Sequence, residues 1–225
     1  MGKKFSAIML LVLSALLSCG AGCADLGGLA IAGKASTLGL GGEVATGITQ
    51  NVNARVGVNM LDLDLDDIEL DDVDYDIGLD FSSFSALVDW HVFDGSFRLT
   101  GGVVSMNHEV DMEGTGAAGE TVEIGDGTYT WANVGTLTGS AEIDDLAPYV
   151  GIGWGDLLSS KKKWGLYCDF GVVFTGSTDV KLTATGAGAT PGLPADLAKE
   201  RDDIKDELEA FKFYPVISLG LFFQF

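Results

Sequence analysis

The chain ends in Tyr214-Pro-Val-Ile-Ser-Leu-Gly-Leu-Phe-Phe-Gln-Phe225, a stretch in which apolar residues alternate with small or polar ones. The strand that this alternation predicts carries on one face Ile217, Leu219, Leu221, Phe223 and Phe225. In a water-soluble sheet, such a terminal strand would form an exposed apolar edge that invites aggregation. In a barrel that spans a bilayer, acyl chains solvate the same face and both edges of the strand are paired. The stretch therefore predicts the closing strand of an all-β, antiparallel, up-and-down transmembrane β-barrel.

The other end of the chain has the layout of a secretory signal peptide. Lys3 and Lys4 precede an apolar run from Phe5 to Leu17, and small residues follow. The run is shorter than the ~20 residues that a membrane-spanning helix needs. We therefore expect a signal peptide over residues 1–24 and one barrel domain over residues 25–225.

The cysteines leave two cleavage sites open. Small residues up to Ala24 favour ordinary cleavage there. Leu16-Leu17-Ser18-Cys19 also resembles a lipoprotein cleavage box, which would make Cys19 an acylated amino terminus. Cleavage after Ala24 leaves Cys168 as the one remaining cysteine, so we expect no intrachain disulfide.

The charge of the chain restricts its partners. The formal net charge is −20, from 33 acidic and 13 basic residues. Nucleic acids and anionic membrane surfaces bind basic patches, so neither is an expected partner. The acidic residues must lie in water above the membrane, or inside the barrel.

Alternation with a period of two recurs along the chain and marks further strands. We predict seven clear strands, at Leu38–Ile48, Ala54–Met60, Val73–Phe93, Phe97–Val103, Leu137–Trp154, Trp164–Phe174 and Tyr214–Phe225. Bacterial single-chain barrels have an even number of strands, and a poorly marked stretch from Leu26 to Gly33 brings the count to eight. The apolar phase shifts at Ser82-Ser83, where we expect a β-bulge that keeps both apolar sets facing outward.

Long and short connections alternate between these strands. The predicted long connections are Asp62–Asp72, Asn107–Asn133 and Ser177–Ala210. Short ones follow at Thr49, Asp94 and Asp156, which is the pattern of long extracellular loops and short periplasmic turns. A small hairpin is expected around Gly125-Asp126-Gly127, and a helix over residues 195–211 that packs on the barrel rim.

The chain resembles a known family at three places. These are Ala54-Arg-Val-Gly-Val-Asn59, Pro148-Tyr-Val-Gly-Ile-Gly-Trp154 and the terminal strand. They are similar to the small bacterial outer-membrane barrels of the OmpA, OmpX and OmpW types. We expect a monomer in the outer membrane of a Gram-negative bacterium, with outer-membrane lipid and lipopolysaccharide as its partners. The resemblance implies the fold of these barrels. It also implies insertion by the barrel-assembly machinery, which would read the terminal strand through Leu221, Phe223 and Phe225; it implies no shared activity.

Charged residues collect on the faces predicted to point inward. They are Glu43, Arg55, Asp89, Arg98 and Asp169. The interior of an eight-stranded barrel is just wide enough to be filled by side chains, and unpaired charges there are costly. We expect a structural network of paired charges; a path for protons, ions or polar solutes is the alternative.

One acidic run is a candidate for cation binding. It contains Asp62, Asp64, Asp66, Asp67, Asp71 and Asp72, with no basic residue among them. Divalent cations such as calcium favour clustered carboxylates. The run lacks the glycine turn and terminal glutamate of a calcium-binding loop, so a solvated acidic hairpin is the preferred interpretation.

Catalysis has little support in the sequence. His91 and His108 are the two histidines, and only His108, with Ser105 and Asp111 nearby in sequence, falls near the outer rim. We predict no catalytic residue, no cofactor and no enzyme. The expected function is a structural barrel or a narrow channel for small or hydrophobic solutes; the alternative is an enzyme that acts on lipid or protein at the rim.

Overall fold

The computed structural model describes residues 28–70, 73–92, 95–158, 163–176, 178–208 and 212–225. The predicted signal peptide, Cys19 included, lies outside these residues.

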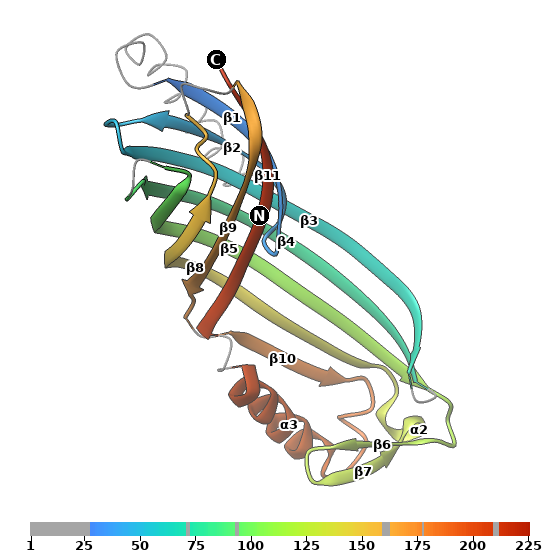
Figure 1. Ribbon diagram of the computed structural model, residues 1–225. Coiled ribbons are helices and arrows are strands. Elements are labelled where there is room, and N and C mark those ends of the chain that lie inside the picture. The colour runs from blue at the N-terminus through green and yellow to red at the C-terminus, as the bar shows by residue number, and fades with distance from the viewer. Residues whose placement is uncertain (1–27, 71–72, 93–94, 159–162, 177, 209–211) are drawn as a thin grey trace.

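Eight antiparallel strands close into a ring (Figure 1). They are β1 (Leu29–Ser36), β2 (Gly39–Gly47), β3 (Val52–Leu70), β4 (Val73–Trp90), β5 (Phe97–Gly116), β8 (Leu137–Trp154), β9 (Trp164–Phe174) and β11 (Phe213–Gln224). The ring closes because the terminal strand β11 pairs with β1 on one side and with β9 on the other. The predicted barrel of eight strands is confirmed, and the poorly marked first strand is β1.

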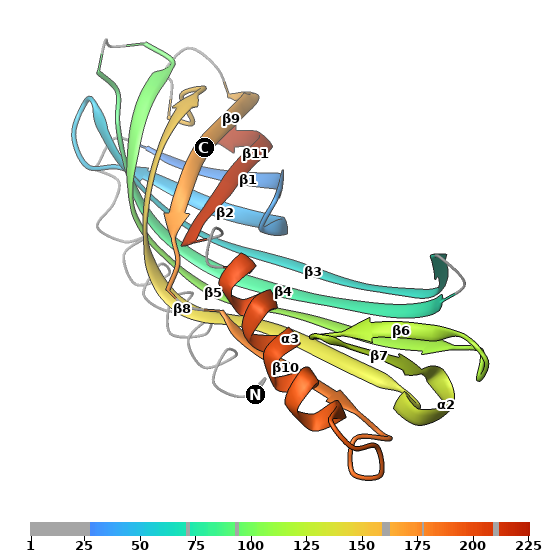
Figure 2. The ribbon, with the colours of Figure 1, turned by 90° about the horizontal axis from the view of Figure 1, so that it is seen from below.

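The strands of the ring have two different lengths. Strands β3, β4, β5 and β8 have 18 to 20 residues, whereas β1, β2, β9 and β11 have 8 to 12. The tall strands continue beyond the ring as an open sheet, which β10 (Asp179–Ala184) extends (Figure 2). Strand β8 serves both parts, because Leu137–Glu142 pair with β10 and Tyr149–Trp154 pair with β9.

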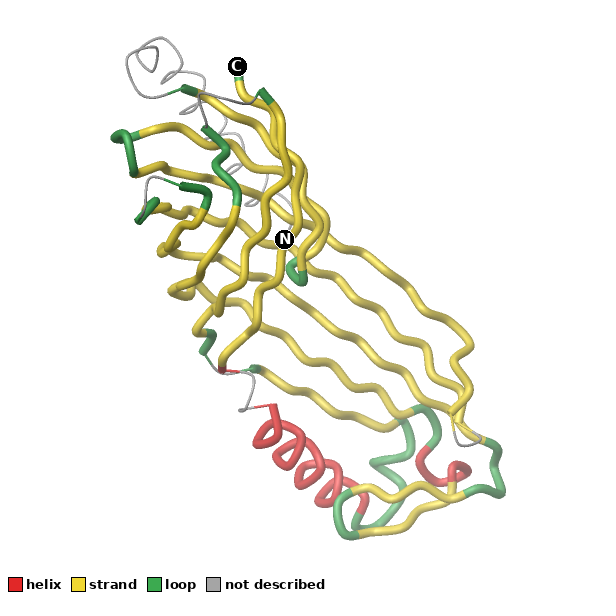
Figure 3. The backbone as a smooth tube through the Cα atoms, in the orientation of Figure 1, coloured by secondary structure: helices red, strands yellow, loops and turns green. Residues whose placement is uncertain are grey.

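A small α/β layer packs against the tip of this open sheet. It consists of the hairpin β6 (Thr121–Ile124) and β7 (Gly127–Thr130), helix α2 (Trp131–Val134) and helix α3 (Leu193–Leu208). We call these elements, together with β10 and the tall strands beyond the ring, the sheet module; Figure 3 shows its strands running on from the barrel. Among the described residues, no helix is long and apolar enough to cross a membrane.

The sheet module has a core of its own. Its buried side chains are Ile124, Trp131, Val134, Leu193 and Leu197. The indole of Trp131 lies against Gly114 and Gly116 of β5, where a Cβ atom at Gly116 would come within 2.4 Å of the ring. The predicted hairpin is confirmed, whereas the predicted helix packs on β10 and on the hairpin rather than on the barrel rim.

Two predictions about the tall strands are wrong. The expected long connection Asp62–Asp72 is strand on both sides, because β3 runs to Leu70 and β4 begins at Val73. The connection expected from Asn107 likewise begins as strand, since β5 continues to Gly116. Asp62, Asp64, Asp66 and Asp67 of the acidic run therefore lie in strand β3, and not in a loop.

The β-bulge expected at Ser82-Ser83 is also absent from β4. The register between β4 and β5 runs without a shift from Val73↔Gly116 to Trp90↔Leu99, and the register shift of the neighbouring pair lies on β3, between Leu65 and Ile68. The strand keeps one phase while its surroundings change: within the ring its outward face meets lipid, and beyond the ring its outward face meets water.

The outer surface of the ring is apolar. Its exposed side chains include Leu40, Met60, Val88, Val103, Leu146, Val150, Leu166, Phe170, Ile217, Leu219 and Leu221. Soluble monomers rarely expose large apolar surfaces, so these side chains, which occur on strands all around the ring, indicate a lipid-facing belt. Trp90, Trp154 and Trp164 lie at the end of the ring where β1 begins and β11 ends, and indole rings favour the level of the lipid headgroups.

Candidate functional site: the lumen and the sheet module

A charged layer crosses the lumen of the ring. All five residues expected there face inward and lie together, and Lys34 joins them. The layer consists of Lys34 on β1, Glu43 on β2, Arg55 on β3, Asp89 on β4, Arg98 on β5 and Asp169 on β9. Three cations face three anions, so the formal charge of the layer is zero.

Arg55 is the centre of this layer. Its guanidinium lies 2.9 Å from Glu43, 2.6 Å from Asp89 and 3.1 Å from Asp169, measured between nitrogen and carboxylate oxygen. The Arg55 side chain is 1% exposed. A buried guanidinium that is shared by three carboxylates ties β2, β3, β4 and β9 together across the lumen.

Arg98 and Lys34 complete the pairing. Arg98 Nη2 lies 2.6 Å from Asp169 Oδ1, and Lys34 Nζ lies 2.9 Å from Glu43 Oε2. Thr100 Oγ1 donates a hydrogen bond of 2.7 Å to Asp89. The sequence reasoning missed Lys34 because it ended the first strand at Gly33; the inward phase Ala30, Ala32, Lys34 is the signal that could have found it.

Clusters of buried apolar side chains lie in the lumen on both sides of the charges. On the side of the sheet module lie Leu38, Leu87, Val104, Met106, Ala147, Tyr149, Val173 and Val216. On the opposite side, where β1 begins and β11 ends, lie Ala30, Ala32, Ala45, Leu157, Tyr167 and Phe222. The wall makes room for these rings with glycine, since a Cβ atom at Gly171 would lie 2.3 Å from the Tyr149 hydroxyl oxygen. The ring is thus a packed core, as expected for eight strands.

Neither histidine is placed as a general base. His108 is 4% exposed, stacks on Phe81 at 4.5 Å between ring centroids, and has no hydrogen-bond partner at either ring nitrogen. Ser105 and Asp111 lie at odd positions of β5 and therefore on the opposite face from His108. His91 Nε2 lies 3.8 Å from Asp156 Oδ1, which is too long for a hydrogen bond. His108 is therefore not next to Ser105 and Asp111, the neighbours that the enzyme alternative required.

The outward face of the sheet module is acidic. One row of directly paired residues crosses five strands and contains Asp62, Asp80, Glu109, Glu142 and Asp179. Like charges that face each other across a strand pair are destabilising. No residue of this row carries a positive charge, and Lys181, two positions after Asp179, lies on the same face of β10.

The candidate cation-binding residues lie beside this row. Asp64, Asp66 and Asp76 line a shallow cavity of about 310 Å³ with Asp111 and Glu113. Within the described part of the chain, no three acidic, histidine or cysteine side chains converge as metal ligands would. The side chain of Asp67 and all of Asp71 and Asp72 lie outside the described residues.

The residues expected to form the assembly signal all face outward on β11. Leu221, Phe223 and Phe225 are 53%, 45% and 72% exposed. The rings of Phe223 and Phe225 meet edge to face at 5.3 Å. The strand is therefore fully paired while its apolar face stays open to lipid.

Solved structures share the fold of this chain. The chain matches CarO2 of Acinetobacter baumannii with a TM-score of 0.67 and 19% sequence identity, over 89% of this chain and 99% of that chain. It has the fold of the small bacterial outer-membrane barrels. CarO of the same organism matches with a TM-score of 0.66 and 19% identity, over 88% and 98% of the two chains. No protein-family model and no curated protein matches the sequence.

The chain therefore has the predicted fold class, an antiparallel ring of strands with a late helix. The closed ring and its apolar belt accord with the predicted outer-membrane location, because closed barrels are the sheet structures that span bilayers. The tall wall and the helical layer on one end distinguish it from a plain ring.

Proposed function

We propose that this protein is a sealed outer-membrane barrel that anchors its sheet module at the cell surface. The role is structural, and it is neither that of an open channel nor that of an enzyme. The observation that carries this proposal is the filled lumen, in which a neutral charged layer lies between two apolar layers. Bacterial barrels have short periplasmic turns and long extracellular connections, which puts the sheet module outside.

The filling of the lumen argues against passage of solutes. Arg55, Arg98 and Asp89 are each at most 2% exposed, so water does not reach the charges that an ion path would need. A side chain from the connection after β8, Leu157, is 2% exposed and packs into the end of the lumen next to Tyr167. Opening a channel would require this packing to be broken.

Conductance in planar bilayers tests the proposal. We expect the purified barrel to give no stable unitary conductance at any voltage, with an open porin as the positive control and swelling of liposomes in small sugars as the second measurement. A reproducible conductance from the wild-type chain would overturn the proposal and favour the narrow channel.

A second candidate role is the binding of hydrophobic solutes on the inner face of the sheet module. Leu63, Leu65 and Met112 lie on this face and are 43%, 43% and 39% exposed. Exposed apolar patches in water mark binding sites. A solvatochromic apolar dye should bind to the folded protein, and substituting Leu63 and Leu65 with Asn should reduce its fluorescence if this role holds.

A further inference from the structure

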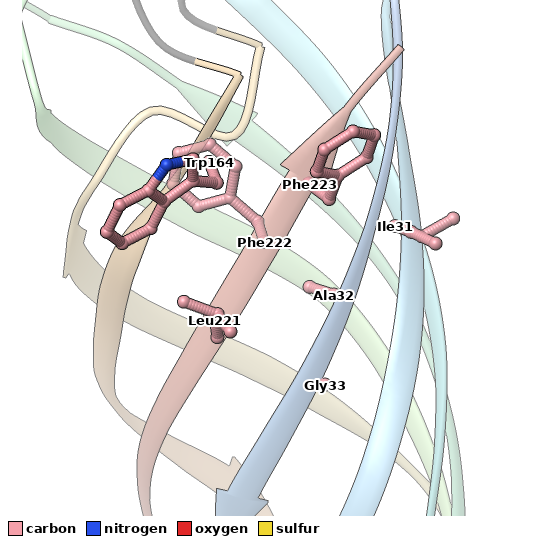
Figure 4. A pocket seen from close by; sticks show the side chains of 7 residues that line it. All are labelled: Ile31, Ala32, Gly33, Trp164, Leu221, Phe222 and Phe223. Carbon is pink, nitrogen blue, oxygen red and sulfur yellow. The ribbon is translucent and has the colours of Figure 1, made fainter.

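A groove of about 400 Å³ lies on the outer surface of the ring, at the seam where β1 meets β11. Its outward-facing walls are Ile31 and Gly33 of β1, Leu221 and Phe223 of β11, and Trp164 of β9. Figure 4 shows Trp164, Phe223 and Ile31 at the end nearest the carboxyl terminus, with Gly33 farther along the seam. The groove faces the interior of the bilayer, because it is part of the apolar belt.

Gly33 makes the surface hollow at this point. It pairs with Gly42 on one side and with Leu221 on the other, so two neighbouring outward positions lack a side chain. A Cβ atom at Gly33 would meet nothing within 4 Å. Neither packing nor a left-handed backbone requires glycine here. The side chains around it stand out from the wall, with Leu221 53% and Trp164 66% exposed.

An exposed lysine lies in the chain directly before one end of the groove. Lys163 directly precedes Trp164, is exposed, and accepts a hydrogen bond of 2.8 Å from the Gln224 backbone N–H through its carbonyl oxygen. This bond fixes Lys163 beside the end of β11, next to Phe223. Lys161-Lys162-Lys163 is the one run of three basic residues in a chain of net charge −20. Within the described residues, Lys163 forms no ion pair.

We propose that this seam groove binds one acyl chain of an anionic phospholipid whose phosphate lies at Lys163. The chemistry of the two ends matches such a lipid. Lysine extends its charged end to the interface while its stem lies along apolar surface, and tryptophan favours the headgroup level. The hollow at Gly33 lies on the hydrocarbon side of both, so an acyl chain that passes Trp164 enters it. The proposal does not depend on the lumen being sealed.

The test is native mass spectrometry of the full barrel, released from detergent in the presence of phosphatidylglycerol or phosphatidylethanolamine. The wild-type protein should retain one lipid and prefer phosphatidylglycerol. Gly33→Leu fills the groove and should lose the retention of both lipids. Lys163→Gln should keep the acyl chain but lower the preference for phosphatidylglycerol by about fivefold, the effect of about one lysine near an anionic lipid surface.

The matched control is Gly101→Leu. Gly101 is another lipid-facing glycine, on β5 away from the seam, and a Cβ atom there has its nearest neighbour at 3.9 Å. This variant should retain lipid as the wild type does. Gly33→Ala adds a single methyl group to open space, and it should give a partial loss if Gly33→Leu does not assemble.

Three outcomes would overturn the proposal. Equal lipid retention by the wild type, Gly33→Ala and Gly33→Leu would show that the groove holds no lipid. Equal retention of the two lipids by the wild type would remove the role of Lys163. A dimer that Gly33→Leu dissociates would show that a second copy of the chain fills the groove.

Discussion

Substitution of Arg55 by Met should destabilise the barrel more than any surface change. The wild-type layer has three cations and three anions, so removing one cation leaves a net charge of −1 among buried groups. Breaking a buried ion pair by removing one partner costs about 3–5 kcal/mol. Each carboxylate keeps another partner, namely Lys34 or Arg98, so we expect a loss of about 3 kcal/mol.

A compensating variant isolates the cause. Adding Asp89→Asn to Arg55→Met returns the layer to zero charge and leaves the pairs Lys34–Glu43 and Arg98–Asp169 intact. The double variant should therefore be more stable than Arg55→Met alone. Lys199→Met is the control, because its exposed pair with Asp126 is worth at most about 1 kcal/mol.

The assay is urea unfolding in lipid vesicles, followed by tryptophan fluorescence and by the heat-dependent gel mobility of the folded barrel. The midpoint should fall in Arg55→Met and partly recover in the double variant, with similar slopes for all variants. A loss below about 1 kcal/mol for Arg55→Met, or a double variant no better than the single one, would refute the account of the lumen as a neutral, paired layer.

Three further predictions concern the sheet module and the last strand. Replacing Asp80 by Asn together with Glu109 by Gln removes two adjacent charges from the acidic row, so the thermal stability of the barrel at low salt should rise. This gain should shrink in high salt, because salt screens the charges. Calcium at fixed ionic strength should stabilise the wild type more than this variant; no calcium effect on the wild type would leave the row as a solvated surface. Deleting Phe225 should lower the yield of assembled barrel far more than the stability of barrels already formed, since lipid burial of this side chain is worth only about 1.5–3 kcal/mol; equal membrane yields would contradict this. The hydroxyl of Tyr129 donates a hydrogen bond to Asp196, which raises the pKa of Tyr129 above its ordinary value. Asp196→Asn should lower that pKa in an absorbance titration. In the wild type, the contact should be present at neutral pH and lost as the pH rises through the raised pKa.

The sequence predicted the ring because each of its faces has a fixed environment. Lipid selects apolar residues outside, and a narrow interior selects small residues and paired charges inside, so the period of two identifies both faces. Arg55 and Asp169 could be placed in one layer although 114 positions separate them, because the inward phase is the same on every strand of a small barrel. Lys34 was missed where the alternation is weak: Gly33 gives no apolar signal on the outer face of β1.

The sheet module could not be predicted from the same alternation, because the apolar residues of a strand face outward within the membrane and inward beyond it. On β4, Phe84 and Val88 face outward to lipid, whereas Ile77 and Leu79 face inward. The apparent phase slip at Ser82-Ser83 is thus the point where the outward face passes from acyl chains into water. The same rule explains the acidic row, because Asp80, its member on β4, lies just beyond that point. Where the apolar residues of a barrel strand change from the outward to the inward face without a register shift, the strand leaves the bilayer. If the residues that face outward beyond this point are acidic, as on β4, a β-bulge should not be inferred.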